Sequence, residues 1–186
     1  MKRIRLKGKL VILRPLSLKD APDFCRWFAD PELTKFLFPW QHQAQPTLRE
    51  ERDWINESFK KKNNLNFAID SSAGVHIGRI SLKNIESSNE IAELGVIIGD
   101  QKYWGQGFGT EAIKLIIDYG FSKLKLNMIY LRYIAFNIQA EKSYRKVGFK
   151  PAGRYRQALK LNGFYHDECL MDLLRAEWVK ARKLKK

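Results

Sequence analysis

The chain has 186 residues, about the length of one domain and enough to bury a core without disulfides or bound metal. Hydrophobic residues make up 45% of it and aromatic residues 12%, which excludes the disordered and fibrous classes. The formal net charge is +14, and the excess lies at the ends: residues 1–9 carry five basic side chains and no acidic one, and residues 175–186 carry six basic side chains beside Glu177. We interpret both ends as solvated tails that aid solubility, with contact to RNA, the ribosome or a phosphorylated cofactor as the alternative.

No apolar run approaches the roughly 20 residues that a membrane-spanning helix needs, and no signal-peptide core follows Met1-Lys2-Arg3. We therefore expect a cytoplasmic protein with no membrane partner. Cys25 and Cys169 lie far apart, and the histidines are equally scattered, so we expect neither a disulfide framework nor a metal site. Whether the chain is a monomer or a homodimer stays open.

Apolar periodicity and capping signals predict one α+β domain over residues 1–186. In its first half we expect a strand over 9–15, a helix over 18–29 capped by Ser17, a helix over 47–62 that begins with a Thr47–Glu50 capping box, and strands over 66–70, 76–84 and 90–98.

In the second half we expect a helix over 109–124, a central strand over 128–135, a short helix over 137–148 and a hairpin with strands over 155–161 and 164–173. Asn162-Gly163 joins the hairpin strands, because this pair is preferred in two-residue turns. A short helix and a basic tail from about residue 179 close the chain.

The segment most informative about function joins the strand over 90–98 to the helix over 109–124. Its glycines at 105, 107 and 109 let the backbone approach a ligand, and N–H groups at a helix start attract negative charge. This predicts a phosphate or pyrophosphate site, with a flexible strand-to-helix turn as the alternative. A P-loop does not fit, because Thr110-Glu111 follows Gly109. A Rossmann fingerprint does not fit either, because the glycine spacing differs and residues 125–135 contain no acidic side chain.

Two motifs resemble the GCN5-related N-acetyltransferases (GNAT), in the branch of the ribosomal-protein alanine N-acetyltransferases. Trp104-Gly-Gln-Gly-Phe-Gly109 is similar to the family signature Q/R-x-x-G-x-G/A, from which Trp104 departs at the first position. Asn137-x-x-Ala-x-x-x-Tyr144-x-x-x-Gly-Phe149 follows about 30 residues later, as in the family. Similarity at both ends extends the resemblance over nearly the whole chain.

The resemblance implies a central, twisted, mostly antiparallel sheet of six to seven strands, flanked by about four helices, with splayed central strands. It also implies transfer of an acetyl group from acetyl-CoA to a primary amine, by direct attack in a ternary complex and without a metal. The acceptor is either a protein N-terminus, as in the ribosomal-protein enzymes, or a small molecule such as a polyamine, aminoglycoside, amino sugar or amino acid. A non-catalytic acyl-CoA-binding regulator, or a basic RNA- or ribosome-binding module on the same fold, is the alternative.

The resemblance assigns the cofactor contacts to three parts of the chain. Backbone N–H groups of the loop would hold the pyrophosphate: Gly105, Gln106, Gly107, Phe108, Gly109 and Thr110. The backbone of Val96, Ile97 and Ile98 would pair with the pantetheine arm and supply an oxyanion donor. Asn137 would bind the pantetheine, cap a helix, or both, and Lys142, with Arg145 and Lys146, could meet the outer phosphates or form a solvated helix face.

Two residues are the candidate catalytic groups. Tyr144 matches the family tyrosine that protonates the departing thiolate; a packed core tyrosine is the alternative. Glu93 is the candidate general base, because the resemblance implies a Glu on the strand before the loop that reaches the amine directly or through water, and an apolar setting would raise its pKa; an exposed strand carboxylate is the alternative. His76 could serve as the base instead, although a lone strand histidine is more often structural. Neither cysteine lies in a motif, which argues against an enzyme-bound intermediate.

Acceptor choice is expected to depend on the two N-terminal helices, the loop over 38–42 and the hairpin around Tyr165-His166-Asp167. Trp40 and Trp54 could form a pocket wall or belong to the core. Four acidic side chains could attract a cationic amine or simply form an exposed helix face: Glu50, Glu51, Asp53 and Glu57.

Overall fold

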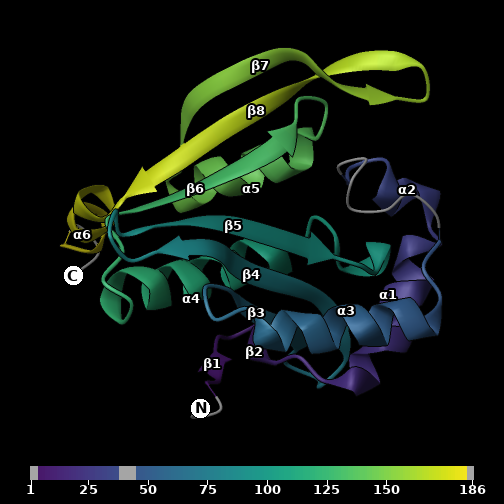
Figure 1. The fold of residues 1–186 in the computed structure, drawn as a ribbon. Helices are drawn as coiled ribbons and strands as arrows, with labels where there is room; N and C mark the ends of the chain where they lie inside the picture. The colour runs from purple at the N-terminus through teal and green to yellow at the C-terminus, as the bar shows by residue number, and fades with distance from the viewer. Residues whose placement is uncertain (1–3, 38–44, 184–186) are drawn as a thin grey trace.

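The computed structural model describes residues 4–37 and 45–183. Its centre is one eight-stranded sheet with the order β1-β2-β3-β4-β5-β6-β8-β7 (Figure 1). The strands are β1 (Leu6–Lys7), β2 (Val11–Pro15), β3 (Leu65–Ser71), β4 (His76–Glu86), β5 (Ile91–Ile98), β6 (Met128–Ile134), β7 (Lys150–Leu161) and β8 (Phe164–Leu174). The mixed, mostly antiparallel architecture that the resemblance implies is confirmed.

The two halves of the sheet meet at its only parallel pair of described strands, β5 and β6. Their pairing covers just three residues of β5 and ends where Glu93 faces Tyr130. Beyond that point β5 continues to Ile98, while β6 stays paired with β8 up to Ile134. The two strands therefore diverge, as Figure 1 shows, and the backbone of residues 94–98 has no strand on that side.

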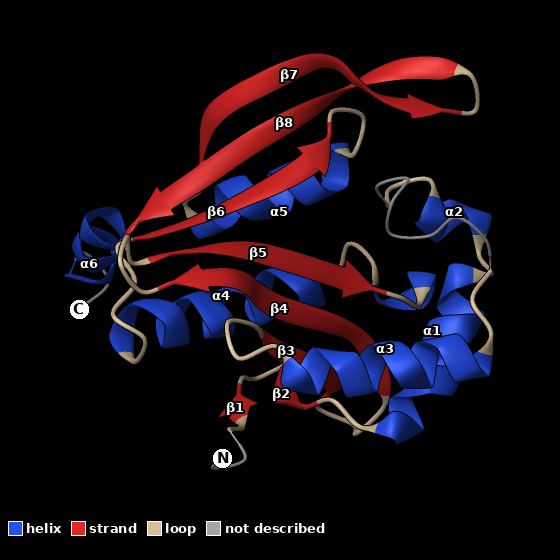
Figure 2. Cartoon of the chain, viewed as in Figure 1, coloured by secondary structure: helices blue, strands red, loops and turns tan. Residues whose placement is uncertain are grey.

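The helices lie on both faces of the sheet (Figure 2). On one face, α4 (Phe108–Ser122) and α5 (Ile138–Val147) cover the main core, which includes Ile80, Ile113 and Leu131. α4 buries the apolar stripe that the sequence predicts for it.

On the other face, α1 (Ala21–Phe28), α2 (Pro31–Thr34) and α3 (Leu48–Lys60) enclose a second, smaller core around Phe24 and Ile55. Ser17 and Thr47 form the capping boxes that open the first 3-10 turn and α3, and the Thr47 box was expected.

α6 (Arg175–Lys183) closes the described chain. Within the described ranges no helix is long and apolar enough to cross a membrane.

Several boundaries differ from the sequence prediction. The sheet has eight strands, and β1 is a two-residue strand too short to produce a periodic pattern. The helix predicted over 18–29 begins as a 3-10 turn over Leu18–Asp20 because Pro22 stands in the first turn of α1. The four-residue α2 was not predicted.

β7 begins at Lys150, not at 155, and its irregular register after Pro151 hides the alternation of apolar and polar residues. The turn at Asn162-Gly163 is confirmed, with φ of 48° and 85°.

Glu111, in the first turn of α4, holds the turn between β1 and β2. Its carboxylate accepts hydrogen bonds from the backbone N–H groups of Lys9, Leu10 and Val11 at 3.0, 2.6 and 2.9 Å. Gly8 lies so close that a Cβ there would be 2.4 Å from the Glu111 Oε2 atom. Because hydrogen bonds to a charged acceptor are strong, this carboxylate ties the N-terminal strands to the start of α4.

Glu111→Ala is expected to lower the free energy of unfolding by about 2 kcal/mol, because three backbone donors lose a charged acceptor. For a chain of this size that loss corresponds to a Tm decrease of roughly 4–8 °C. Lys114→Ala, at an exposed position of the same helix, is the control and should change Tm by no more than about 2 °C. Equal effects of the two variants would show that the carboxylate does not support this turn.

Candidate active site

A cavity of about 720 Å³ passes through the gap between β5 and β6. Its volume lies within the range of roughly 300–1,000 Å³ that is typical of ligand sites. Side chains alternate along β5, so Glu93, Gly95 and Ile97 face the α3 side of the sheet. Leu94, Val96 and Ile98 face the α4 side, and all six residues line the cavity. The site is thus open to both faces of the sheet at the point where its strands separate.

The glycine loop lies at the α4 side of this cavity. Gly105 and Gly107 have φ of 72° and 92°, a left-handed conformation that residues with a side chain rarely adopt. Gly107 is the N-cap of α4 and no side chain caps the helix, so the N–H groups of the first turn lack an intrahelical acceptor. The loop therefore presents unpaired donors and the positive end of a 15-residue helix.

Tryptophan at position 104, where the family signature has Gln or Arg, fixes the start of this loop. Its indole Nε1 atom donates a hydrogen bond to the backbone oxygen of Ile98 at 2.8 Å. Its ring packs against Phe36, which in turn contacts Phe136, with centroid distances of 6.2 and 5.9 Å. These three aromatic residues connect β5, the segment after α2 and the loop after β6 across the open end of the gap.

Most residues expected to contact the cofactor line the cavity: Val96, Ile97, Ile98, Gly105, Gly107, Gly109, Thr110, Asn137 and Lys142. Gln106 and Phe108 do not line it. The Gln106 amide donates to the backbone oxygen of Lys102, and Phe108 packs edge-on against Tyr103. For both residues the expected contact is a backbone one.

On α5, Asn137 caps the helix, its side-chain oxygen accepting from the Ala140 N–H at 3.1 Å. Lys142 and Lys146 line the cavity from the same helix. Arg145 does not line it, because its guanidinium pairs with Glu141 at 2.8 Å. Two of the three basic side chains considered for the outer phosphates are thus in reach of the site.

Glu93 is buried, with 5% of its surface exposed, and its surroundings are ionic rather than apolar as expected. Its Oε1 atom lies 3.3 Å from both the Lys83 ammonium and the Arg132 guanidinium. Its Oε2 atom accepts a hydrogen bond from the Asn84 amide at 3.3 Å. Arg132 also pairs with Glu168 at 3.1 Å. The carboxylate is therefore held in one position between neighbouring strands.

Tyr144 is 7% exposed and lines the cavity from α5, in contact with the rings of Tyr133 and Phe149. Burial raises the pKa of its phenol to about 12. The raised pKa keeps the phenol neutral at physiological pH. Because none of the described residues forms a hydrogen bond with the hydroxyl, its proton is available to a ligand in the cavity.

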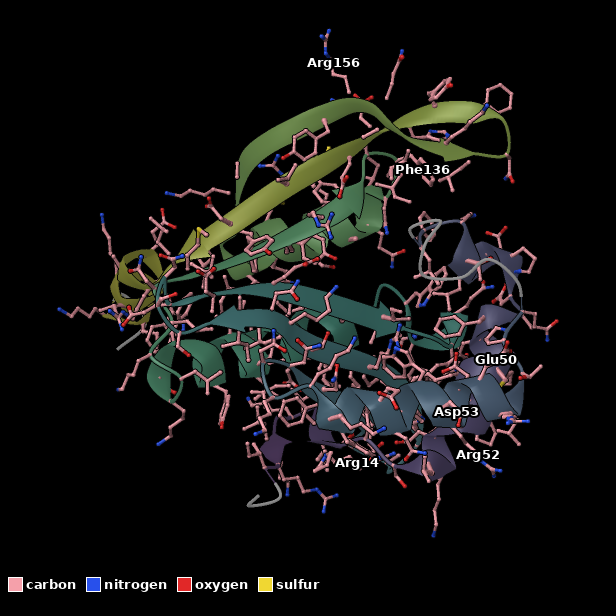
Figure 3. All side chains as sticks on the ribbon, in the orientation of Figure 1. Arg14, Glu50, Arg52, Asp53, Phe136 and Arg156 are labelled. Carbon is pink, nitrogen blue, oxygen red and sulfur yellow. The ribbon has the colours of Figure 1, made fainter. Side chains whose placement is uncertain are left out.

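The expected acceptor-binding groups are only partly in the cavity. Trp54 and Glu57 line it. Glu50 is engaged in the α3 capping box and Asp53 is exposed beside Arg49, so both lie at the surface of α3 (Figure 3). Glu51 is buried but does not line the cavity.

The other candidates for acceptor choice lie elsewhere. His76 is outside the cavity lining, where its Nδ1 atom is 2.8 Å from Asp23 and its Nε2 atom 3.0 Å from the Gly78 oxygen. The hairpin residues Tyr165, His166 and Asp167 do not line the cavity either. The predicted loop over 38–42, with Trp40, falls outside the described residues.

Sequence reasoning missed Arg79, Lys83 and Arg132, which line the cavity together with Ser81. A signal was present, because Arg79, Ser81 and Lys83 alternate with apolar residues on a predicted strand. They share one face of β4, opposite Ile97, Gly95 and Glu93 of β5. Identifying that face as part of a site required the tertiary arrangement.

No group of three or more His, Cys, Asp or Glu side chains in the described part of the chain could hold a metal ion. Cys25 and Cys169 are free and half-buried, and neither lines the cavity.

Comparisons with known proteins agree with this arrangement. The acetyltransferase (GNAT) domain family matches residues 11–150. The uncharacterized N-acetyltransferase p20 of Bacillus licheniformis is 30% identical over 167 residues, covering 89% of this chain and 93% of its own. The spermidine N(1)-acetyltransferase of Escherichia coli strain K12 is 27% identical over 173 residues, covering 93% of this chain and 90% of its own.

Among solved structures, the spermidine N-acetyltransferase from Vibrio cholerae in complex with CoA and spermine has the same fold. The TM-score is 0.83 at 23% identity, over 92% of this chain and 99% of that one. The family match covers most of the chain and includes both motifs, the glycine loop and Tyr144. The chain belongs to the acetyltransferase (GNAT) family and is an acetyl-CoA-dependent N-acetyltransferase.

Proposed function

We propose that the protein transfers the acetyl group directly to a primary amine, with both substrates bound in the cavity at once. The observation that carries this proposal is the gap between β5 and β6, which opens on both faces of the sheet. Acetyl-CoA would enter from the α4 side and the amine from the α3 side, so that they meet where the strands separate. A direct transfer needs no covalent relay, and neither described cysteine lines the cavity.

The residues present fit acetyl-CoA, which supplies an activated acetyl thioester when it is bound. The loop from Gly105 to Thr110 would hold the pyrophosphate through its N–H groups, because the helix start is uncapped and its glycines leave the backbone open. The edge of β5 that faces the gap, at Val96, Ile97 and Ile98, would hold the pantetheine arm in the way that one strand holds its neighbour. Asn137 would add a side-chain contact, and Lys142 and Lys146 would meet the outer phosphates.

Glu93 and Tyr144 would divide the proton transfers between them. In this reaction the nitrogen–carbon bond forms, the carbon–sulfur bond breaks, the amine loses a proton and the sulfur gains one. We assign uptake of the amine proton to the Glu93 carboxylate, directly or through water, and donation to the sulfur to the Tyr144 hydroxyl. With its pKa raised to about 12, Tyr144 is a weaker acid than a free phenol, so its donation is best coupled to the breaking of the carbon–sulfur bond.

For the acceptor we propose a small-molecule amine. The α3 side of the cavity carries Lys61, Arg79, Lys83 and Arg132 against Glu57 and Glu93. This cationic excess does not favour a polyamine, the class of acceptor named for the two spermidine acetyltransferases above. We place the reaction in the cytoplasm, where acetyl-CoA is available.

A ribosomal protein N-terminus is the second candidate acceptor. The formal charge of +14 would attract the protein to ribosomal RNA, and the exposed strand β7 carries Arg154, Arg156 and Lys160 with no acidic residue. Figure 3 shows Arg156 on the outer side of the hairpin. Acetylation of a ribosomal-protein N-terminal peptide in preference to every small amine of a panel would support this candidate.

Tyr144→Phe should lower kcat at least about tenfold, because the ring is kept and only the proton donor is lost. The KM for acetyl-CoA should change by no more than about threefold, since this hydroxyl is assigned no role in binding. Tyr133→Phe removes the hydroxyl of a neighbouring buried tyrosine and is the control, expected to keep kcat within about threefold. Steady-state kinetics would test this, and equal kcat values for Tyr144→Phe and the unmodified protein would remove Tyr144 from the mechanism.

Glu93→Gln should lower kcat/KM for the amine at neutral pH, because no group then accepts the amine proton. The loss should shrink as the pH rises toward the pKa of the free amine, because solution then supplies the neutral nucleophile. A pH profile of kcat/KM for both proteins measures this. A loss that is constant over the whole range would mean that Glu93 only positions Lys83 and Arg132.

Gly107→Val should weaken CoA binding at least about tenfold, because its φ of 92° is strained for valine and the side chain crowds the unpaired N–H groups. Gly163→Val is the matched control, since Gly163 has a φ of 85° in the distant hairpin turn and a Cβ added there would meet nothing within 4 Å. Isothermal titration with CoA should give a Kd within about twofold of the unmodified protein for this control. Equal CoA affinity of the two variants would refute the loop assignment.

A further inference from the structure

Arg79 lines the cavity and contacts aromatic rings, whereas no described carboxylate forms an ion pair with it. It projects from β4 on the α3 side, in register with Ile97 of β5. Its guanidinium carbon lies 4.3 Å from the ring centroid of Trp54 and 5.5 Å from those of Phe24 and Phe28. Cation–π contacts of this kind hold the guanidinium by its face and leave the N–H groups at its edge.

Those N–H groups have no ion-pair partner in the described part of the chain. The charge that acts most on Arg79 is that of Glu51, and the two residues form no ion pair within the described part of the chain. Burial raises the pKa of Glu51, and the Arg79 charge opposes that shift. Burial lowers the pKa of Arg79 to about 10, which still leaves it charged at neutral pH. Arg79 is half-buried and lines the cavity, so an anion bound there would accept hydrogen bonds from its guanidinium.

Two of the three other cations on this side of the cavity have a carboxylate partner. Lys83 and Arg132 both contact Glu93. Arg79 lies four residues from Lys83 along β4, roughly 13 Å away. Glu93 and Arg79 therefore lie at two ends of the α3 side of the cavity, where the acceptor would bind. Between them runs the part of β5, from residue 94 onward, that is no longer paired with β6.

We propose that Arg79 binds an anionic group of the acceptor, so that the substrate is an amine that also carries a carboxylate or a phosphate. The anion would lie on the guanidinium edge, and the amine would point toward the gap between β5 and β6. A guanidinium forms paired hydrogen bonds with either anion, which gives both affinity and a fixed orientation. This inference rests on the proposed function. Under it, the cationic lining of the cavity selects amines that carry an anionic group and disfavours polyamines.

The test compares matched acceptors that differ only in the anion. L-Phenylalanine is paired with 2-phenylethylamine for the carboxylate, and O-phosphoethanolamine with ethanolamine for the phosphate; spermidine is added as a polyamine. Acetylation rates and, without CoA, ligand-dependent changes in Tm are measured for the unmodified protein, Arg79→Gln, Arg79→Lys and Arg52→Gln. Arg52 is exposed on α3, so its variant loses the same charge away from the cavity (Figure 3).

We expect the unmodified protein to prefer the anionic member of at least one pair by roughly tenfold or more in kcat/KM, the value of a charge-assisted hydrogen bond. Arg79→Gln should lose that preference while its kcat/KM for the uncharged member stays within about threefold, and Arg52→Gln should keep it. Arg79→Lys, which retains the charge, should recover part of it. The pair that shows the preference identifies the anion.

A preference for the uncharged amines or for spermidine would overturn the inference, as would an equal loss on both members of a pair in Arg79→Gln. The Tm measurement decides the question even if no acceptor is acetylated, because the anionic member alone should stabilise the unmodified protein. Failure of the proposed function has a different signature, which is the absence of CoA binding by the unmodified protein.

Discussion

The site depends on one constraint, the early end of the parallel pairing between β5 and β6. After Glu93, β6 follows β8 while β5 follows β4, and neither strand returns to the other. Backbone N–H and C=O groups inside a protein cost free energy when they have no hydrogen-bond partner. The groups of β5 that face this gap therefore need a partner, which a ligand or water would supply. It also joins the two faces of the sheet, which allows two substrates to approach one point from opposite sides. Glu93 stands where the pairing ends, which places its carboxylate at the bottom of the gap.

The elements around the gap are fixed by interactions distant in sequence. Glu111 ties the start of α4 to the turn between β1 and β2, and Trp104 ties the loop to the last carbonyl of β5. The glycine loop is therefore anchored on both sides, although three of its six residues, from Gly105 to Thr110, have no side chain. On the opposite face, α1 and α3 surround Arg79 with aromatic rings. A rigid frame of this kind would let a helix start and a single guanidinium act as directed binding groups, as proposed above.

Features local in sequence were predicted well. The glycines of the loop, the cap at Asn137, the motif tyrosine and the Asn162-Gly163 turn depend on short spacings, and the structure shows the loop at a helix start and the turn in its hairpin. Features that depend on distant contacts were not predicted. The ionic setting of Glu93 requires Lys83 and Arg132 from two neighbouring strands, and the stacking of Arg79 requires Trp54 from a helix 25 positions earlier. β1 and α2 are too short for periodicity to reveal them.

Hydrogen exchange of the backbone amides, measured with and without CoA, shows whether the separated strands hold the cofactor. Saturating CoA should slow exchange in two segments, residues 94–98 of β5 and residues 105–110 of the glycine loop, because each contains amides that face the cavity without a strand or cap partner. Exchange in the β7–β8 hairpin should stay unchanged, since it is paired within itself and away from the cavity. Protection confined to other segments, with both of these unaffected, would contradict the claim that the separated strands hold the cofactor.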